Sequence, residues 1–245
     1  MKPQLLVAFG AGLLVGCAPT LAPHTPYLPA LRDQGQVEAR LSTGLGGSQL
    51  QLGYQLSNRL VLHTELLSAG RPVTAKGFYS AGLGAGYYYL SPNGRWRVGT
   101  HAGLAYGSGT SGSSSCFECG GVGFGSEYAV RYTYAYVQPT VLLEDGQRTW
   151  GLALRLGQTY YHQLREVRTD NATGQAQLFD YVGHRSTFVQ PTFQYSHQIQ
   201  RWLVVSGTFG AQGFLGSPRR VNYVSPFVAQ AGLHFVISTR AAARP

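Results

Sequence analysis

The stretch QVEARLSTGLGGSQLQLGYQL, residues 36–56, decides the fold class because polar and apolar side chains alternate along it. The apolar residues keep one parity and the polar residues the other, on both sides of Gly46-Gly47. Successive side chains of a β-strand point to opposite faces, so a period of two predicts strands with one apolar and one polar face. The stretch therefore predicts a β-hairpin with a Gly-Gly turn.

The same alternation continues along the chain and predicts ten strands. They cover residues 36–45, 48–57, 59–69, 77–90, 95–107, 127–143, 148–164, 184–197, 200–215 and 224–237. Several are longer than the usual strand of a soluble domain and could cross a bilayer at a tilt. Short turns alternate with longer connections, as in outer-membrane barrels, whose short turns are periplasmic. We predict an all-β, transmembrane, antiparallel up-and-down β-barrel over residues 36–237, with ten strands and with eight or twelve as alternatives.

Three prolines interrupt this pattern at Pro139, Pro191 and Pro226. Proline removes a hydrogen bond from a β-ladder and belongs at a bulge or at a strand end. We therefore expect bulges or pairing breaks there. The strand that contains Pro139 is the place where the number of strands is most easily miscounted.

Aromatic residues gather beside the short turns. An arginine follows each such turn, at Arg59, Arg95, Arg148 and Arg201. A girdle of interface aromatics is predicted from Tyr87, Tyr88, Tyr89, Trp96, Trp150 and Trp202. Amphipathic rings gathered at one level are typical of the boundary between membrane and water.

The N-terminus has the layout of a secretory signal, with Lys2 followed by an apolar run and small Gly16. It is too short for a membrane span. Leu14-Val15-Gly16-Cys17 resembles the lipobox of bacterial lipoproteins, in which the cysteine carries acyl chains after cleavage. The resemblance implies a signal peptide over residues 1–16, lipid on Cys17 and, over residues 17–35, a proline-rich tether. The expected arrangement places Cys17 on the periplasmic side, and residues 238–245 form a short C-terminal tail.

The composition agrees with an envelope protein. Of 245 residues only 12% are charged, while there are 33 Gly and 16 Tyr, and lysine occurs only at Lys2 and Lys76. The net charge of +9 comes from singly spaced arginines, so we expect no nucleic-acid partner. Outer-membrane lipid is the expected partner.

Cys116 and Cys119 form a C-x-x-C in a Gly/Ser-rich connection. In an exported protein we interpret them as a candidate disulfide, with free thiols, metal or redox chemistry as alternatives. No metal site and no cofactor is predicted elsewhere.

The parity of the strands assigns a set of ionisable residues to the lumen. These are Glu38, Arg40, His63, Glu65, Arg97, His101, Arg131, Arg155 and His234. A ten-stranded barrel has little free interior, and buried charges must be paired, so a structural network is the first interpretation. A narrow pore with a positive lining is the functional alternative. The opposite parity, including Tyr128, Val130, Tyr132, Tyr134 and Tyr136, is expected to face lipid.

No catalytic residue is predicted. Ser196 and His197 are adjacent on a strand and so point to opposite faces, and the pair of Asp180 with His184 would lie on an exposed loop. An extracellular ligand, if there is one, is expected at the loops 108–126 and 165–183.

The whole pattern resembles the small outer-membrane barrel proteins of Gram-negative bacteria, especially lipid-anchored members of the Bacteroidota type. The lipobox, the linker Tyr27-Leu28-Pro29-Ala30-Leu31 leading to Gly35-Gln36-Val37-Glu38, and the turn-Arg-Trp hairpins carry the resemblance. It implies fold and location: a lipid-anchored outer-membrane barrel with a mostly filled lumen and an envelope-structural or surface-binding role. A small anion-preferring pore and a soluble periplasmic β-barrel lipoprotein are the alternatives.

Overall fold

The structure is a computed structural model and describes residues 24–45, 47–71, 76–113, 124–170, 173–215 and 227–238. The strands in this part of the chain are β1 (Gln36–Leu45), β2 (Gly47–Gln55), β3 (Leu60–Arg71), β4 (Lys76–Leu90), β5 (Trp96–Ser113), β6 (Phe124–Asp145), β7 (Arg148–Asp170), β8 (Ala176–Asp180), β9 (Arg185–Gln200), β10 (Leu203–Ala211), β11 (Gly213–Leu215) and β12 (Phe227–Ser238). No helix within the described ranges is long and apolar enough to span a membrane.

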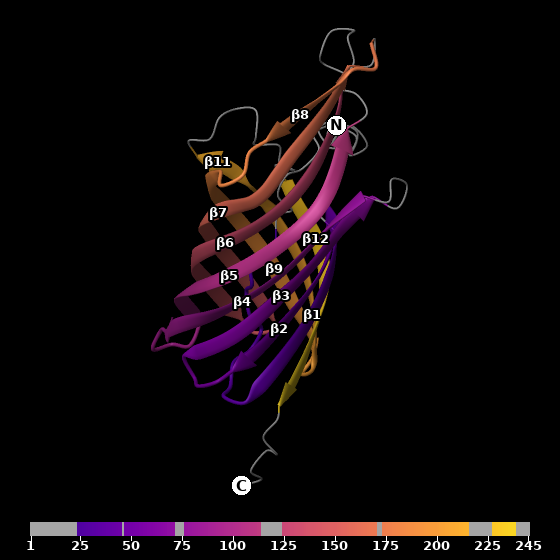
Figure 1. The fold of residues 1–245 in the computed structure, drawn as a ribbon. Helices are drawn as coiled ribbons and strands as arrows, with labels where there is room; N and C mark the ends of the chain where they lie inside the picture. Colours follow the sequence, from indigo (N-terminus) through magenta and orange to yellow (C-terminus); the bar gives the residue numbers. More distant parts are fainter. Residues whose placement is uncertain are drawn as a thin grey trace, which may run out of the picture.

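Ten of these strands close into an antiparallel barrel (Figure 1). Neighbours in sequence pair from β1 to β7, then β7 pairs β9, β9 pairs β10, β10 pairs β12 and β12 returns to β1. β11 continues the course of β10 beside β9, and β8 pairs only with the outer part of β7. The predicted all-β barrel of ten strands is confirmed.

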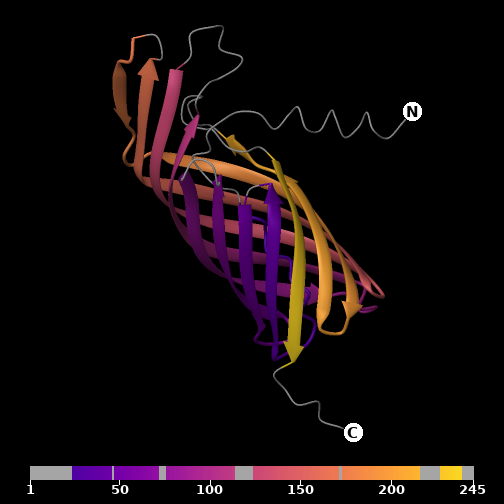
Figure 2. The ribbon, with the colours of Figure 1, turned by 90° about the vertical axis from the view of Figure 1, so that its right-hand side faces the viewer.

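The barrel has one even rim and one uneven rim. The short turns lie at one end, where β12 also ends, and Gly94 and Gly146 take left-handed conformations there, with φ of 68° and 60°. At the other end β6, β7 and β8 rise above the rest of the wall (Figure 2). Residues 108–113, 124–126, 165–170 and 176–180 are therefore strand, and not the loops that the sequence pattern suggested.

The alternation of burial along the strands separates an inner from an outer face. On β7 the pattern repeats buried and exposed positions from Gly151 to Leu156, and the same period holds on β9 and β10. Tyr87, Tyr89, Trp96, Trp150 and Trp202 lie on the outer face near the short turns. Tyr88 is the exception in the predicted girdle: it is 1% exposed and points inward, as the residue between two outward neighbours on a strand must.

The inner face of β6 is opposite to the predicted one. Tyr128, Val130, Tyr132, Tyr134 and Tyr136 are all buried, while Arg131 is exposed on the outer face. The tyrosine rings pack in one buried cluster with Phe78, Tyr161 and Phe188. Arg131 lies near the outer end of the strand, beside Ser108 and Gln163, where a charge remains near water.

The expected pairing breaks are present at Pro139 and Pro191. The ladder between β6 and β7 omits Gln138 and Pro139 but resumes in the same register. Pro191 pairs with Leu154 on β7, whereas on its other side the ladder of β9 breaks between Thr192, opposite Gly210, and Val189, opposite Gly213. The register shifts lie elsewhere, between Arg131 and Tyr132 and between Leu203 and Val204.

Several predictions fall on positions outside the described residues. They are the signal peptide 1–16, Cys17, Cys116, Cys119, Pro226 and the tail beyond Ser238.

Candidate functional site

The lumen is occupied by the chain's own N-terminal segment, residues 24–32, which we call the plug. His24, Thr25, Tyr27, Leu28 and Leu31 are at most 2% exposed, and they lie in extended chain ahead of β1. The tether prediction is therefore wrong for these residues. They do not run between a lipid and a folded body but inside the barrel.

The plug runs lengthwise through the lower half of the lumen. Its start at His24 lies near the middle of the walls, because the His24 carbonyl accepts from Gln190 and its ring faces Tyr134. Its end at Arg32 pairs with Glu144, next to a short turn. The chain then reverses at residues 33–35 and enters β1 in the opposite direction, with Gly35 at a φ of 81°. The N-terminal end of the plug thus points toward the uneven rim.

Glutamine side chains from the walls bind the plug's backbone. Gln49 accepts from the Thr25 amide at 2.9 Å, and Gln51 donates to the Thr25 carbonyl at 2.8 Å. Gln138 and Gln190 donate to the carbonyls of Tyr27 and His24, at 2.9 and 2.7 Å. All four glutamines are buried, so these bonds satisfy amides that would otherwise be costly to bury.

Tyr27 fills a pocket lined by residues of β1, β2 and β3. Its hydroxyl donates to Glu38 at 2.9 Å, and its ring stacks on His63 with centroids 4.7 Å apart. Gly53 makes room for it, because a Cβ at that position would collide with the Tyr27 hydroxyl. Glycine on the inner face of β2 is therefore what admits a large aromatic side chain.

Around Glu65 lies the central charge network. Arg155 donates to both Glu65 oxygens, at 2.7 and 3.2 Å, and its guanidinium lies 4.0 Å from the centre of the Tyr136 ring. His24 of the plug lies 3.4 Å from the same carboxylate. Two charges removed from water are stable only when paired and hydrogen-bonded, and this pair is both.

A second network surrounds Glu38. His234 lies 2.5 Å from one oxygen of Glu38, and the Ser206 hydroxyl is 2.8 Å from the other ring nitrogen. The second oxygen of Glu38 accepts from Tyr27 and from the Ala30 amide. Glu38 therefore joins β1, β12 and the plug.

The remaining predicted lumen residues, apart from Arg131, also lie inside. Arg40 donates to Gln194 at 2.6 Å and to Thr208 at 2.8 Å. Arg97 donates to the Leu31 carbonyl and to Glu144, and His101 contacts Tyr88. Eight of the nine predicted residues thus line the interior, and Arg131 is the ninth, on the outer face.

The sequence pattern did not identify the plug or its glutamine partners. A signal was present as glutamines at Gln49, Gln51 and Gln190, because a long amide in a lumen needs something to bind. Gln138 carried no such signal, since it stands on the parity of β6 that was predicted to face lipid. Pro26 and Pro29 are a second signal, since proline carries no amide hydrogen that would need a partner inside.

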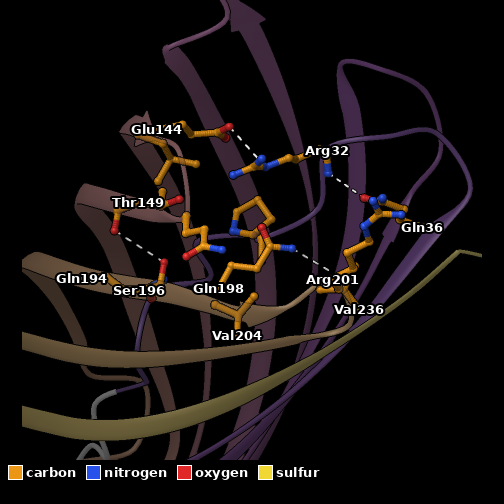
Figure 3. Close-up of a pocket in the computed structure, with 14 residues that line it drawn as sticks. Arg32, Gln36, Glu144, Thr149, Gln194, Ser196, Gln198, Arg201, Val204 and Val236 are labelled. Atoms are coloured by element: carbon orange, nitrogen blue, oxygen red, sulfur yellow. Dashed lines mark hydrogen bonds and ion pairs between the residues drawn. The ribbon is translucent and has the colours of Figure 1, made fainter.

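A small polar cavity lies where the plug reaches the even rim (Figure 3). It encloses about 60 Å³, and its lining includes Arg32, Glu144, Thr149, Gln198 and Arg201. A cavity needs about 10–15 Å³ of this kind of volume to hold one water, so the space suits a few waters rather than a larger ligand.

No catalytic arrangement emerges among the residues that sequence analysis considered. The Ser196 hydroxyl donates weakly to the Thr149 carbonyl at 3.5 Å, and the ring of His184 stacks on Tyr161. Within the described ranges, no three His, Cys, Asp or Glu side chains are grouped to hold a metal ion.

No protein-family model and no curated protein matches this sequence. Among solved structures, the chain is similar to in-vitro folded OmpT, an outer membrane protein of Vibrio cholerae. The identity is 9%, the match covers 83% of this chain and 96% of that chain, and the TM-score is 0.21. A likeness this distant carries no inference about function.

Proposed function

We propose that the chain is an outer-membrane β-barrel lipoprotein, anchored through Cys17, whose lumen is closed by its own plug. The role is envelope-structural or surface-binding, without catalysis and without a cofactor. The observation that carries the proposal is the apolar outer face of the barrel.

Every barrel strand exposes a large apolar side chain on the outside. One from each strand is Leu41, Leu52, Leu62, Leu83, Leu104, Val137, Leu152, Phe193, Phe209 and Leu233, between 39% and 69% exposed. A soluble domain rarely leaves a continuous apolar surface of this extent in water. In transmembrane barrels the side chains along each strand alternate between an apolar outer face and a polar inner face. The outer face of this barrel therefore supports a transmembrane barrel rather than a soluble lipoprotein.

The filled lumen supports a closed barrel over the anion-preferring pore. The plug occupies the lower lumen, and the inner arginines are engaged by Glu65, Glu144 or Gln194 rather than free to attract an anion. A pore would require the plug to leave.

Binding, if the protein has a ligand, belongs on the raised part of the wall. There β8 stands beside the outer end of β7, with Leu178 and Val182 about two thirds exposed, at 64% and 66%. These positions fall within the region 165–183 that sequence analysis selected, while the centre of 108–126 lies outside the described residues.

The experiment is a pair of measurements on the protein refolded in detergent and in a planar bilayer. We expect a shift in gel mobility between unboiled and boiled samples, because closed membrane barrels resist detergent, and no steady conductance from the plugged barrel. Identical mobility together with release from membranes after removal of the lipid would contradict the membrane assignment. Steady anion-selective openings would instead support the pore.

A further inference from the structure

The walls hold the plug mainly through hydrogen bonds to its backbone. We propose that the lumen is a binding channel for an extended polypeptide, of which residues 24–32 are the occupant supplied by the chain itself. An equivalent segment supplied in trans binds the same channel when the plug is weakened or severed. The proposal rests on the plugged lumen of the proposed function but not on the membrane around it.

Side chains of the wall bind the plug through hydrogen bonds to its main chain. Gln49, Gln51, Gln138 and Gln190 all bond to main-chain atoms of the plug. Arg97 donates to the Leu31 carbonyl, and Glu38 accepts from the Ala30 amide at 3.0 Å. Contacts of this kind recognise an extended backbone whatever its side chains are, as in other modes of peptide recognition.

The wall does not depend on the plug. Each barrel strand pairs with its two neighbours, so the ladder is complete without residues 24–32. Within the described part of the chain, backbone-to-backbone bonds between the N-terminal segment and the wall begin only at Gly35, which donates to the Gln55 carbonyl. The plug can therefore be exchanged without opening the barrel.

The lining of the channel determines which polypeptide fits. The channel offers an aromatic pocket at Gly53 and His63, an apolar contact for Leu28 at Gly151 and Leu142, and a carboxylate, Glu65, facing His24. The preferred ligand is an extended segment with a tyrosine, with leucines near it and with a hydrogen-bond-donating or basic group three residues before the tyrosine. Prolines are accepted because they bring no unpaired amide.

The test uses the full chain with Tyr27→Ala and Leu31→Ala, and a fluorescent peptide with the sequence of residues 24–32. We expect saturable binding of the peptide to this variant by fluorescence anisotropy. The wild-type chain should not bind it, because a plug tethered in cis has an effective concentration of about millimolar. A peptide with Tyr27→Ala should bind about tenfold more weakly or worse, since it loses a bond to a buried carboxylate.

Two wall substitutions serve as matched variants in the same background. Gly53→Leu places a side chain where the Tyr27 ring must lie and should abolish binding. Gly207→Ala, where an added Cβ meets nothing within 4 Å, should leave binding unchanged. If both lower the affinity equally, the peptide does not enter the pocket and the proposal is wrong.

A second design covers the case in which the double variant does not fold. A protease site inserted between Asp33 and Gln34, both exposed at the even rim, allows the folded wild-type plug to be severed. The labelled peptide should then exchange with the severed plug, whereas a peptide of the same composition in scrambled order should not. A cut and folded barrel that takes up neither peptide, or both alike, overturns the proposal. A missing gel shift with peptide binding intact would count against the membrane assignment alone.

Discussion

Arg155 is the residue at which wall, plug and charge network meet. Its guanidinium pairs with Glu65 and also donates to Gln138 at 2.9 Å, and Gln138 in turn holds the Tyr27 carbonyl. Arg155→Leu leaves the Glu65 carboxylate buried without its main partner. We expect the free energy of unfolding to fall by about 3–5 kcal/mol, measured by urea titration of tryptophan fluorescence in the refolded protein.

Two comparisons at the same scale sharpen this expectation. Arg95→Leu breaks a pair with Asp145 whose side chains are 58% and 64% exposed, and should cost about 1 kcal/mol or less. The double variant Glu65→Leu, Arg155→Leu removes both charges and should recover most of the stability that Arg155→Leu loses. If Arg155→Leu lowered the free energy of unfolding no more than Arg95→Leu does, the buried Glu65 carboxylate would not need Arg155 as its partner.

At the scale of elements, β6 carries the clearest consequence of the structure. Its inner face holds Tyr134 and Tyr136, and its outer face holds Val137, which is 51% exposed. If the barrel spans a membrane, Val137→Arg puts a charge into the hydrocarbon and should destabilise the protein by about 2–4 kcal/mol. Ala129→Arg, on the same face of β6 but near its outer end, should cost about 0–1 kcal/mol.

Urea unfolding from lipid vesicles measures both β6 variants. Equal costs at the two positions would mean that no hydrocarbon layer surrounds the middle of β6. A cost larger at Ala129 than at Val137 would mean that the membrane midplane lies nearer to Ala129 than to Val137.

The direction of the plug concerns the whole molecule. The sequence pattern predicts Cys17 on the periplasmic side. The plug begins at mid-lumen and fills the route to the even rim, so the N-terminal end of the plug points toward the uneven rim. With short turns in the periplasm, an epitope tag inserted ahead of His24 should bind antibody on intact cells.

A second tag provides the control for this orientation. Inserted in the short turn Ser91–Arg95, it should be detected only after the outer membrane is permeabilised. The reverse pattern would mean that the barrel is inserted the other way, and detection of both tags only after permeabilisation would mean that the plug enters from the periplasm.

The local alternation of polar and apolar residues was sufficient to predict the strands. Side-chain parity is a property of each strand, so the pattern alone predicted β1 at residues 36–45 and placed the short turns, while the longer strands extended past their predicted ends, as β5 does to Ser113. The same parity brought Glu38, Glu65 and Arg155 to the interior.

The sequence by itself thus determined an all-β, ten-stranded barrel, its short turns and most of its inner residues, because the alternation of polar and apolar residues is a local property of each strand. Only the tertiary structure decided that β6 turns its tyrosines inward and that residues 24–32 lie in the lumen. Both depend on the volume left when ten strands close. The plug's glutamine partners, moreover, come from β2, β6 and β9, which are brought together only by that closure.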